Sequence, residues 1–243
     1  MYNSNYVYQI RSEFCYLYQN EQFVIDKTGA KTIEIVSASF IADSPTIFGK
    51  VNTDYVKREL AWYESQSRNI NDIPGGAPSI WKSVATSEGN INSNYGWCIW
   101  SNDNWSQYNN VLNELKNKPN SRRAIMIYTR PSMWEDYNHE GMSDFMCTNA
   151  VQYIIRYGKL DAIVQMRSND VWAGYRNDYA WQSYVLDKLA DDLGIRRGYI
   201  YWNVGSLHLY SSQFYLLDHY IQTGETSITK KMYDELYGAQ KHI

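Results

Sequence analysis

The sequence has 243 residues and a formal net charge of −3, so no overall basic field would attract nucleic acid. This length suits one large domain or two small ones. The 23 Tyr and 9 Trp provide large aromatic rings with a polar group, suited to a core or to contact with a flat ligand. The three cysteines are odd in number and widely spaced, which argues against a disulfide framework or a CxxC metal pattern and favours a reducing compartment.

The N-terminal half shows a strand, two helices and a loop. Residues 32–40 (TIEIVSASF) are mostly β-formers and predict a strand. Helical spacing predicts one helix around Val56, Leu60 and Tyr63, and a second around Trp105, Tyr108, Leu112 and Leu115, ending before Pro119. The two glycines at 75–76 predict a loop and not an interdomain linker.

The C-terminal half alternates strands and helices. Residues 124–128 predict a buried strand, and residues 151–156 and 160–166 predict a hairpin around Tyr157-Gly-Lys159. A helix over residues 179–193 with Gly194 as its C-cap, a strand over 198–204 and a helix over 211–223 follow. No repeat interrupts this order, so we expect a single α/β (α+β) domain over 1–243, with helices layered on a large mixed sheet.

The sequence lacks the motifs of several common enzyme classes. The chain has no Walker loop, HExxH, GxSxG or GxGxxG, and its four histidines are not at ligand spacing, so we expect no metal site. No N-terminal signal pattern or membrane-length apolar run is present, and we expect a soluble, cytoplasmic protein. Cys147 taken alone is more typical of a buried packing residue than of a nucleophile.

Two polar clusters contain arginine. Asn120-Ser-Arg-Arg123 precedes a predicted strand, and Gln165-Met-Arg-Ser-Asn-Asp170 ends another. Guanidinium groups match phosphate oxygens, so these clusters are compatible with a phosphate clamp. Spacing alone favours the plainer interpretation, which is solvated charge at strand ends.

Taken in order, the pieces resemble the thymidylate synthase family. The family has a Cys-His-x-x-x-Gln strand, an Arg-Ser-x-Asp turn, a Gly-x-Pro-Phe-Asn loop and an Asp-x-His-x-Tyr strand. Similar segments follow in the same order here: Cys147 with Gln152, Gln165-Met-Arg-Ser-Asn-Asp170, Gly174-Tyr-Arg-Asn-Asp178 and Asn203-Val-Gly-Ser-Leu-His-Leu-Tyr210. Five upstream segments fall in the family's order: Asp26-Lys-Thr-Gly29, Glu59-Leu-Ala-Trp62, Ile80-Trp81, Asn94-Tyr-Gly96 and Ser121-Arg-Arg123. The resemblance extends from about Asp26 to Tyr210 and implies the layered fold of that family.

The chain also departs from the family pattern at four places. Asp178 stands where the family has a base-reading asparagine, Thr148 replaces a histidine, and Val84 replaces a tryptophan. The apolar C-terminal tail of the synthases is not recognisable in residues 237–243. All four departures resemble the deoxycytidylate hydroxymethylases of T-even-type phages, a branch of the family.

An aspartate at position 178 suits cytosine. Uracil presents an N3–H donor and an O4 acceptor, which an amide matches. Cytosine presents an N4 amine and an N3 that takes up a proton during attack, and a carboxylate accepts from both. The alternative is that Asp178 caps a helix that begins at Tyr179, and the two roles are compatible.

The resemblance implies a mechanism. Cys147 as thiolate would attack C6, C5 would take a one-carbon unit from 5,10-methylenetetrahydrofolate, and water would complete 5-hydroxymethyl-dCMP and release tetrahydrofolate. Close alternatives are a dCMP methylase and a dUMP hydroxymethylase. A more distant alternative is a non-catalytic protein that binds single-stranded nucleic acid through its aromatic faces, but the acidic balance offers no basic groove.

Family roles carry over to further residues, beginning with the nucleotide. The phosphate would be held by Lys27, Arg167 and Ser168, and by Arg122 and Arg123 from the partner subunit of a homodimer. The deoxyribose hydroxyl would be held by His208 and Tyr210, and Gln165 completes the substrate-binding set.

Catalytic and folate roles complete the list. Water and proton transfer would be organised by Glu59, Tyr95 and Asn94. The folate pocket would be lined by Ile80, Trp81, Asp170 and Gly174. Trp81 and Tyr95 are equally compatible with plain core aromatics, whereas Glu59 and Arg167 have less reason to be buried unpaired. Contacts with other enzymes of nucleotide synthesis are a further expectation.

Overall fold

The structure is a computed structural model that describes residues 5–238. The chain forms two compact units, each assembled from segments far apart in the sequence. The first unit comprises the described residues of Met1–Val51, Ser168–Ala180 and Trp202–Ile243, and the second comprises Asn52–Arg167 and Trp181–Tyr201. A single catalytic domain over the whole chain therefore stays a prediction.

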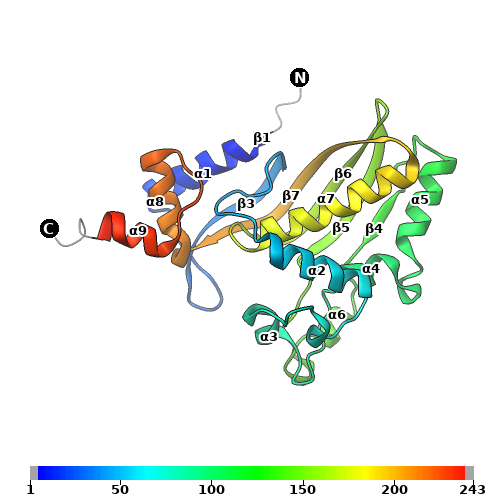
Figure 1. Cartoon of the computed structure of the whole chain (residues 1–243), viewed down its shortest axis with the longest axis horizontal. Helices are drawn as coiled ribbons and strands as arrows, with labels where there is room; N and C mark the ends of the chain where they lie inside the picture. Colours follow the sequence, from blue (N-terminus) through cyan, green and yellow to red (C-terminus); the bar gives the residue numbers. More distant parts are fainter. Residues whose placement is uncertain (1–4, 239–243) are drawn as a thin grey trace. The chain divides into compact units, whose positions relative to one another are not determined.

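The strands of the described chain join in one mixed sheet (Figure 1). Its order is β1-β3-β7-β6-β5-β4, and β2 pairs with β3. The pairing of β1 with β3 is parallel, whereas β4, β5 and β6 pair antiparallel. The predicted α/β class with a large mixed sheet is confirmed.

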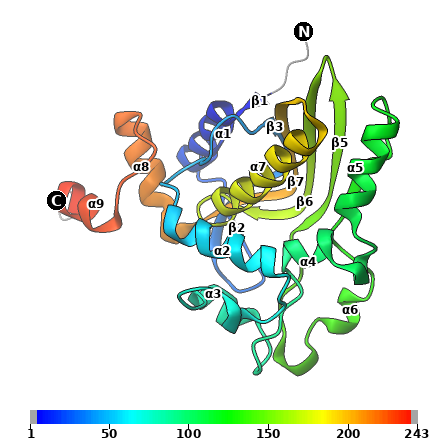
Figure 2. The same ribbon diagram turned by 45° about the vertical axis from the view of Figure 1, so that its right-hand side comes forward.

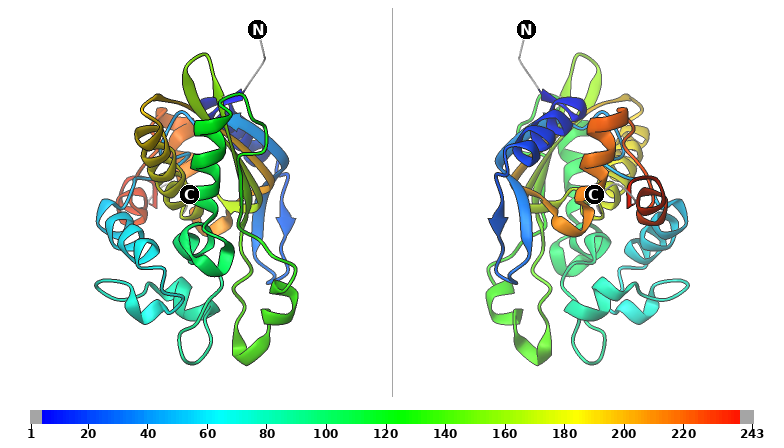
Figure 3. Two further views of the ribbon diagram at one scale, coloured as in Figure 1. Left: turned by 90° about the vertical axis from the view of Figure 1, so that its right-hand side faces the viewer. Right: turned by 90° about the vertical axis from the view of Figure 1, so that its left-hand side faces the viewer.

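The first unit contains β1 (Asn5–Tyr6), α1 (Val7–Gln19), β2 (Val24–Ile25), β3 (Lys31–Ile41), the 3-10 turn Ser211–Gln213, α8 (Phe214–Thr223) and α9 (Lys230–Tyr237). Helix α1 buries Val7, Ile10 and Phe14, an apolar stripe at helical spacing, and lies beside β3 and α8 (Figure 3). The predicted strand 32–40 is β3. The predicted helix 211–223 is confirmed apart from its 3-10 first turn, and it ends at Gly224 with a φ of +77°.

The second unit contains α2 (Thr53–Ser65), α3 (Ser79–Val84), α4 (Tyr95–Trp100), α5 (Gln107–Asn117), β4 (Ile125–Ile127), α6 (Met133–Asp136) and β5 (Thr148–Arg156). Short 3-10 turns lie at Ile70–Asp72, Asn102–Asn104 and His139–Gly141. Three longer elements contribute residues to both units: β6 (Lys159–Asp170), α7 (Gly174–Leu193) and β7 (Arg196–Tyr210). Figure 2 shows α5 running alongside β5 in the second unit, and the two elements are in contact.

The predicted hairpin between β5 and β6 is confirmed. Arg156 pairs with Lys159, so the loop has two residues, Tyr157 and Gly158, with φ values of 51° and 71°. Two consecutive positive φ values are typical of the type I′ turn, whose twist matches that of the flanking strands.

Three expectations require correction. The helix predicted over 179–193 begins at Gly174, so Asp178 lies inside α7 and is not its N-cap. The strand predicted over 198–204 extends to Arg196–Tyr210. Trp105 lies outside α5 because it and Ser106 adopt positive φ values of 54° and 44°, which break the helical path.

The strand predicted as buried over 124–128 is buried on one face only. Met126 is fully buried, but Ile125 and Ile127 are 38% and 54% exposed. This alternation is the two-residue period of a strand with one open face. The apolar C-terminal tail of the synthases is not recognisable in residues 237–243, and most of these residues lie outside the described part of the chain, which ends at residue 238.

Candidate active site

Cys147 immediately precedes β5 in the second unit and is half-buried, whereas Cys15 and Cys98 are buried. Its Sγ lies 3.7 Å from Nη2 of Arg167, and its carbonyl accepts a 2.9 Å hydrogen bond from the Arg167 amide. A neighbouring guanidinium favours the thiolate, which is the nucleophilic form of cysteine. Burial instead raises the pKa of the Cys15 thiol to about 11 and that of Cys98 to about 12. Of the three thiols, Cys147 is the one that is not fully buried and that lies beside a guanidinium.

The guanidinium of Arg167 is held in place by its surroundings. Its Nε donates to the carbonyl of Met146 at 3.0 Å, and its Nη2 donates to the carbonyl of Phe145 at 2.5 Å. It also lies over the Phe145 ring at 5.2 Å, and that ring packs against Trp134 at 4.9 Å. Arg167 is therefore preorganised beside the sulfur of Cys147.

The start of β5 is fixed by a buried hydroxyl pair. Thr148, which stands where the family has a histidine, is fully buried, and its Oγ1 donates to Oη of Tyr95 at 3.1 Å. The pairing of β5 with β6 shifts between Thr148 and Ala150, and the carbonyl of Asn149 accepts from the Tyr128 amide at 2.9 Å. Such a bulge re-aims neighbouring side chains, here directly beside Cys147.

Glu59 is a buried carboxyl on α2. It is 6% exposed and accepts a 2.5 Å hydrogen bond from Oη of Tyr55, one helical turn earlier. Nε1 of Trp81 donates in turn to that Tyr55 oxygen at 2.7 Å. Burial raises the pKa of Glu59 to about 7, and the hydrogen bonds from Tyr55 and Trp81 oppose this rise. A carboxyl with a pKa near neutrality suits proton transfer in both directions.

Asn94 and Tyr95 are part of the core of the second unit. Asn94 is the N-cap of α4, where its Oδ1 accepts from the Trp97 amide at 2.7 Å, and its Nδ2 donates to the carbonyls of Trp62 and Ser67. Tyr95 is buried and stacks on Tyr63 at 5.4 Å. Both side chains have structural contacts, and their predicted roles in water and proton transfer stay predictions.

Helix α3 carries two of the predicted folate residues. Ile80 is 64% exposed, which is unusual for a large apolar side chain, while the Trp81 ring lies edge-on to Trp62 at 5.5 Å. Val84, at the end of α3, contributes its carbonyl, which accepts from the amides of Ser143 and Asp144. Apolar surface is thus available at Ile80, with an indole next to it in the chain.

In the first unit, side-chain hydrogen bonds link the end of β6 to the start of α7. Oδ2 of Asp170 accepts from the amides of Ala173 and Gly174 at 2.6 and 3.2 Å, which satisfies donors at the helix start. Oδ2 of Asp178 accepts from Nδ2 of Asn169 at 2.8 Å. Sequence reasoning missed Asn169, because nothing in the local pattern indicates that it meets a side chain nine residues later.

His208 of the first unit is linked to a carboxylate through a serine. Its Nδ1 lies 3.4 Å from both Oγ and the carbonyl oxygen of Ser206, and Oγ of Ser206 donates to Glu34 on β3. The His208 ring meets Tyr210 edge-on at 5.2 Å. Ser206 stands where the family motif has an aspartate, and Glu34 supplies a carboxylate from the neighbouring strand.

The predicted phosphate-binding residues Lys27 and Ser168 also lie in the first unit. Lys27 is exposed in a turn closed by Asp26, whose Oδ1 accepts from the Thr28 amide at 2.7 Å and from the Ala30 amide at 3.0 Å. Ser168 is half-buried on β6.

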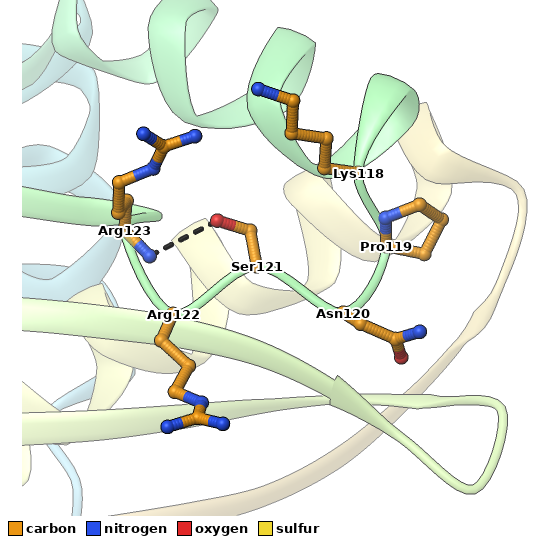
Figure 4. Close-up of a pocket in the computed structure, with 6 residues that line it drawn as sticks. All are labelled: Lys118, Pro119, Asn120, Ser121, Arg122 and Arg123. Atoms are coloured by element: carbon orange, nitrogen blue, oxygen red, sulfur yellow. Dashed lines mark hydrogen bonds between the residues drawn. The ribbon is translucent and has the colours of Figure 1, made fainter.

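The predicted arginine pair lies in the second unit, in a loop whose residues 118–123 line an open hollow (Figure 4). The side chains of Arg122 and Arg123 point to opposite sides of the loop, and the Arg123 amide donates to Oγ of Ser121 at 3.1 Å. Arg123 pairs with Glu114 at 3.1 Å and remains largely exposed. Gln165 is exposed on β6, where it pairs with Ala150.

Residues 5–238, which the structure describes, contain no group of three or more His, Cys, Asp or Glu side chains that could hold a metal ion. No helix in that range has both the length and the apolar content needed to cross a membrane.

Comparison with known proteins agrees with the sequence motifs. The thymidylate synthase family profile matches residues 15–234. The chain is 59% identical over 234 residues to "Deoxycytidylate 5-hydroxymethyltransferase" of Enterobacteria phage T4, which covers 93% of this chain and 95% of the relative. The protein of the same name from phage T2 is 59% identical, with coverage of 94% and 96%. "Thymidylate synthase" of Vesicomyosocius okutanii is 27% identical, with coverage of 78% and 74%. The predicted resemblance is confirmed, and the chain belongs to the thymidylate synthase family.

Proposed function

We propose that the chain is a deoxycytidylate 5-hydroxymethyltransferase. It would transfer a one-carbon unit from 5,10-methylenetetrahydrofolate to C5 of dCMP and add water, giving 5-hydroxymethyl-dCMP and tetrahydrofolate. The observation that carries the proposal is the 59% identity, over nearly the full length of both chains, to phage enzymes of that name. The identity to thymidylate synthases is much lower, at 27% and 26%.

The nucleophile is Cys147. Its thiolate would add to C6 of the pyrimidine, and the electron pair of the C5–C6 double bond would make C5 nucleophilic. The Arg167 guanidinium, fixed 3.7 Å from the sulfur, stabilises the thiolate before attack and again when it leaves. The preorganised charge needs no rearrangement at the moment of reaction.

Residues that would hold the folate are predicted from the family and fit its chemistry. The exposed side chain of Ile80 and the indole of Trp81 offer apolar contact for a flat ring. Asp170 and Gly174 are assigned to the same ligand by resemblance. When bound, the folate supplies the electrophilic one-carbon unit.

Base recognition is assigned to Asp178. Because α7 begins at Gly174, the competing role of helix N-cap is removed, and the carboxylate lies half-buried inside the helix. A carboxylate only accepts hydrogen bonds, so it matches the N4 amine and the protonated N3 of cytosine. It would face the O4 acceptor of uracil unfavourably.

Proton transfer is assigned to Glu59. Its pKa of about 7 allows it to take up or release a proton at neutral pH. Tyr55 and Trp81 form a chain of hydrogen bonds that fixes the carboxyl in place. Tyr95 and Asn94 are proposed to support this network from the core of the second unit.

The remaining substrate contacts follow the family. The phosphate is assigned to Lys27, Arg167 and Ser168. The deoxyribose hydroxyl is assigned to His208 and Tyr210, and Gln165 completes the set. The Nδ1 side of His208 faces Ser206, which leaves Nε2 as the nitrogen to meet the sugar.

A homodimer is proposed because one sheet face of the second unit carries exposed isoleucines. Ile125 and Ile127 project exposed from β4, and the half-buried Ile154 of β5 and Ile163 of β6 lie on the same face, together with Gln152 and Gln165. Exposed apolar patches of this kind typically mark interfaces between proteins. Arg122 and Arg123 would then complete the partner's phosphate site. A cytoplasmic location and contacts with other enzymes of nucleotide synthesis stay predictions.

The test is a product assay with purified protein, methylenetetrahydrofolate and either dCMP or dUMP, with both products identified by mass. We expect 5-hydroxymethyl-dCMP and tetrahydrofolate from dCMP. Release of dihydrofolate would indicate a methylase instead, and turnover of dUMP alone would indicate a deoxyuridylate hydroxymethylase. Absence of turnover with either nucleotide would contradict the proposal.

A further inference from the structure

One buried amide in the first unit has a partner for only one of its two ends. Asn169, the next-to-last residue of β6, is 2% exposed, and its Nδ2 donates to Oδ2 of Asp178 at 2.8 Å. Its Oδ1 is buried and has no hydrogen-bond partner among the described residues. Because a carboxylate only accepts, the Asn169 amide must keep its NH2 end toward Asp178.

This arrangement lowers stability and therefore calls for another explanation. A buried carbonyl oxygen without a partner loses its hydration and gains nothing in return. Leucine has nearly the shape of asparagine and would fill the same space without that penalty. The amide is thus better explained by what its Nδ2 does for Asp178 than by packing, and such local conflicts are typical of functional positions.

The backbone around the pair leaves room for it and holds both ends. A Cβ at Gly174 would lie 3.1 Å from Nδ2 of Asn169 and 3.7 Å from Oδ2 of Asp178, so a side chain at 174 would crowd their meeting point. Asp170, the neighbour of Asn169, is fixed by the amides of Ala173 and Gly174. Asn169 is therefore a rigid donor and not a mobile surface group.

We propose that Asn169 is a positioning residue that sets the choice of base through Asp178, an inference that rests on the proposed function. By holding one carboxylate oxygen, it stops the Asp178 side chain from rotating and directs the remaining lone pairs to the N4 amine and the protonated N3 of cytosine. A held carboxylate also cannot turn away from the O4 of uracil. Asn169 thus improves the fit to one base and worsens the fit to the other.

The first test compares Asn169→Leu with a matched control. Asn177→Leu removes another amide whose Oδ1 is buried and unpaired among the described residues, one position before Asp178 on α7. For Asn169→Leu we expect kcat/KM on dCMP to fall about tenfold to a hundredfold, mainly through kcat, while the dUMP value is unchanged or rises. The Tm should be unchanged or higher, and the control should keep the wild-type ratio of dCMP to dUMP. An unchanged ratio in Asn169→Leu would overturn the inference, as would an equal change in the control.

The second test asks whether Asn169 acts through Asp178. In the Asp178→Asn background, Asn169→Leu should change the ratio of dCMP to dUMP efficiencies far less than it does in the wild-type background, because the two residues act as one unit. Equal effects in both backgrounds would show that Asn169 acts independently of Asp178 and would overturn the inference.

The inference and the proposed function fail in different ways. If the wild-type protein converts neither nucleotide, the proposed function is wrong, and equilibrium binding then decides the role of Asn169. A lower preference for dCMP over dUMP in the Kd values of Asn169→Leu would support it, and an unchanged preference would overturn it.

Discussion

The surroundings of Cys147 and of Asp178 differ in kind. Cys147 lies beside a fixed cation in the second unit, where Glu59 is also buried with its pKa raised. Asp178 lies in the first unit, where a neutral amide donates a hydrogen bond to it and where His208 is oriented through a serine. The region around Cys147 contains charged groups suited to proton transfer and bond formation. The region around Asp178 contains hydrogen-bond donors and acceptors suited to recognising those of a ligand.

This difference predicts two kinds of mutant. Changes around Cys147 should lower the rate on any pyrimidine without altering which nucleotide is preferred. Changes around Asp178 should alter the preference and lower the rate less.

Cys147→Ser should have the largest effect. A hydroxyl is a far poorer nucleophile at neutral pH, so turnover of both dCMP and dUMP should be abolished while dCMP binding is largely retained. Steady-state rates and calorimetric binding measure the two effects. Cys15→Ala is the control, because its thiol is buried and its pKa is raised, and it should retain activity. Wild-type rates in Cys147→Ser would return Cys147 to a packing role.

Glu59→Gln should lower kcat by about a hundredfold to ten-thousandfold, which is typical for loss of a general acid or base. The glutamine fills the same buried space but does not titrate. A pH–rate profile of the wild-type enzyme should show a limb near pH 7 that is missing from the mutant. A limb that persists in the mutant would assign this titration to another group.

The same substitution should raise the stability of the protein at high pH, although it lowers activity. Because the pKa of Glu59 rises from 4.5 to about 7 on folding, the native state binds the proton more tightly than the unfolded state. Wild-type stability contributed by this group is therefore lost as pH rises from about 4.5 to 7. Glu59→Gln should be more stable than wild type at pH 8, by at most roughly 3 kcal/mol, and the gain should shrink toward pH 5. Urea unfolding at the two pH values measures this, and a gain that is independent of pH would contradict it.

Asp178→Asn should change the nucleotide preference. Donors would face each other at cytosine, which costs roughly 1–3 kcal/mol, so the ratio of kcat/KM for dCMP to that for dUMP should fall about tenfold to a hundredfold. Product formation with each nucleotide gives the ratio, and a ratio equal to that of wild type would remove the physical basis for cytosine as substrate.

Mixing two inactive mutants should give the smallest signal. If Arg123 reaches the partner's phosphate, Arg123→Ala and Cys147→Ser combine in a hybrid dimer with one complete site and one lacking both groups. An equal mixture with free exchange should recover on the order of one quarter of wild-type activity. No recovery despite demonstrated subunit exchange would mean that each site lies within one chain.

Local sequence patterns predicted the elements that depend on local physics. Strand β3 and the hairpin at Tyr157-Gly158 follow from β-branched runs and from a turn that requires positive φ values. The start of α7 was missed because Gly174 is a poor helix former, and the helix is begun there by the carboxylate of Asp170, a contact that only the folded chain makes. Trp105 was misplaced because a backbone reversal interrupts a perfect helical spacing.

The candidate site was predictable only where residue identity carries chemistry. Cys147, Arg167 and Asp178 are recognisable in a motif. Asn169 and Glu34 are not, because each becomes relevant through a contact with a residue distant in the sequence. Asn94 shows the reverse case, because a motif residue proves to be a buried helix cap.

The unequal burial of the three thiols makes the natural protein suitable for site-selective labelling. At pH 7, a thiol with a pKa of about 11 or 12 is ionised in only about one molecule in ten thousand or fewer, so Cys15 and Cys98 should react slowly with alkylating reagents. Cys147 is half-exposed beside a cation. One equivalent of iodoacetamide should therefore count functional sites directly, and protection by dCMP would report occupancy of the nucleotide site without any turnover.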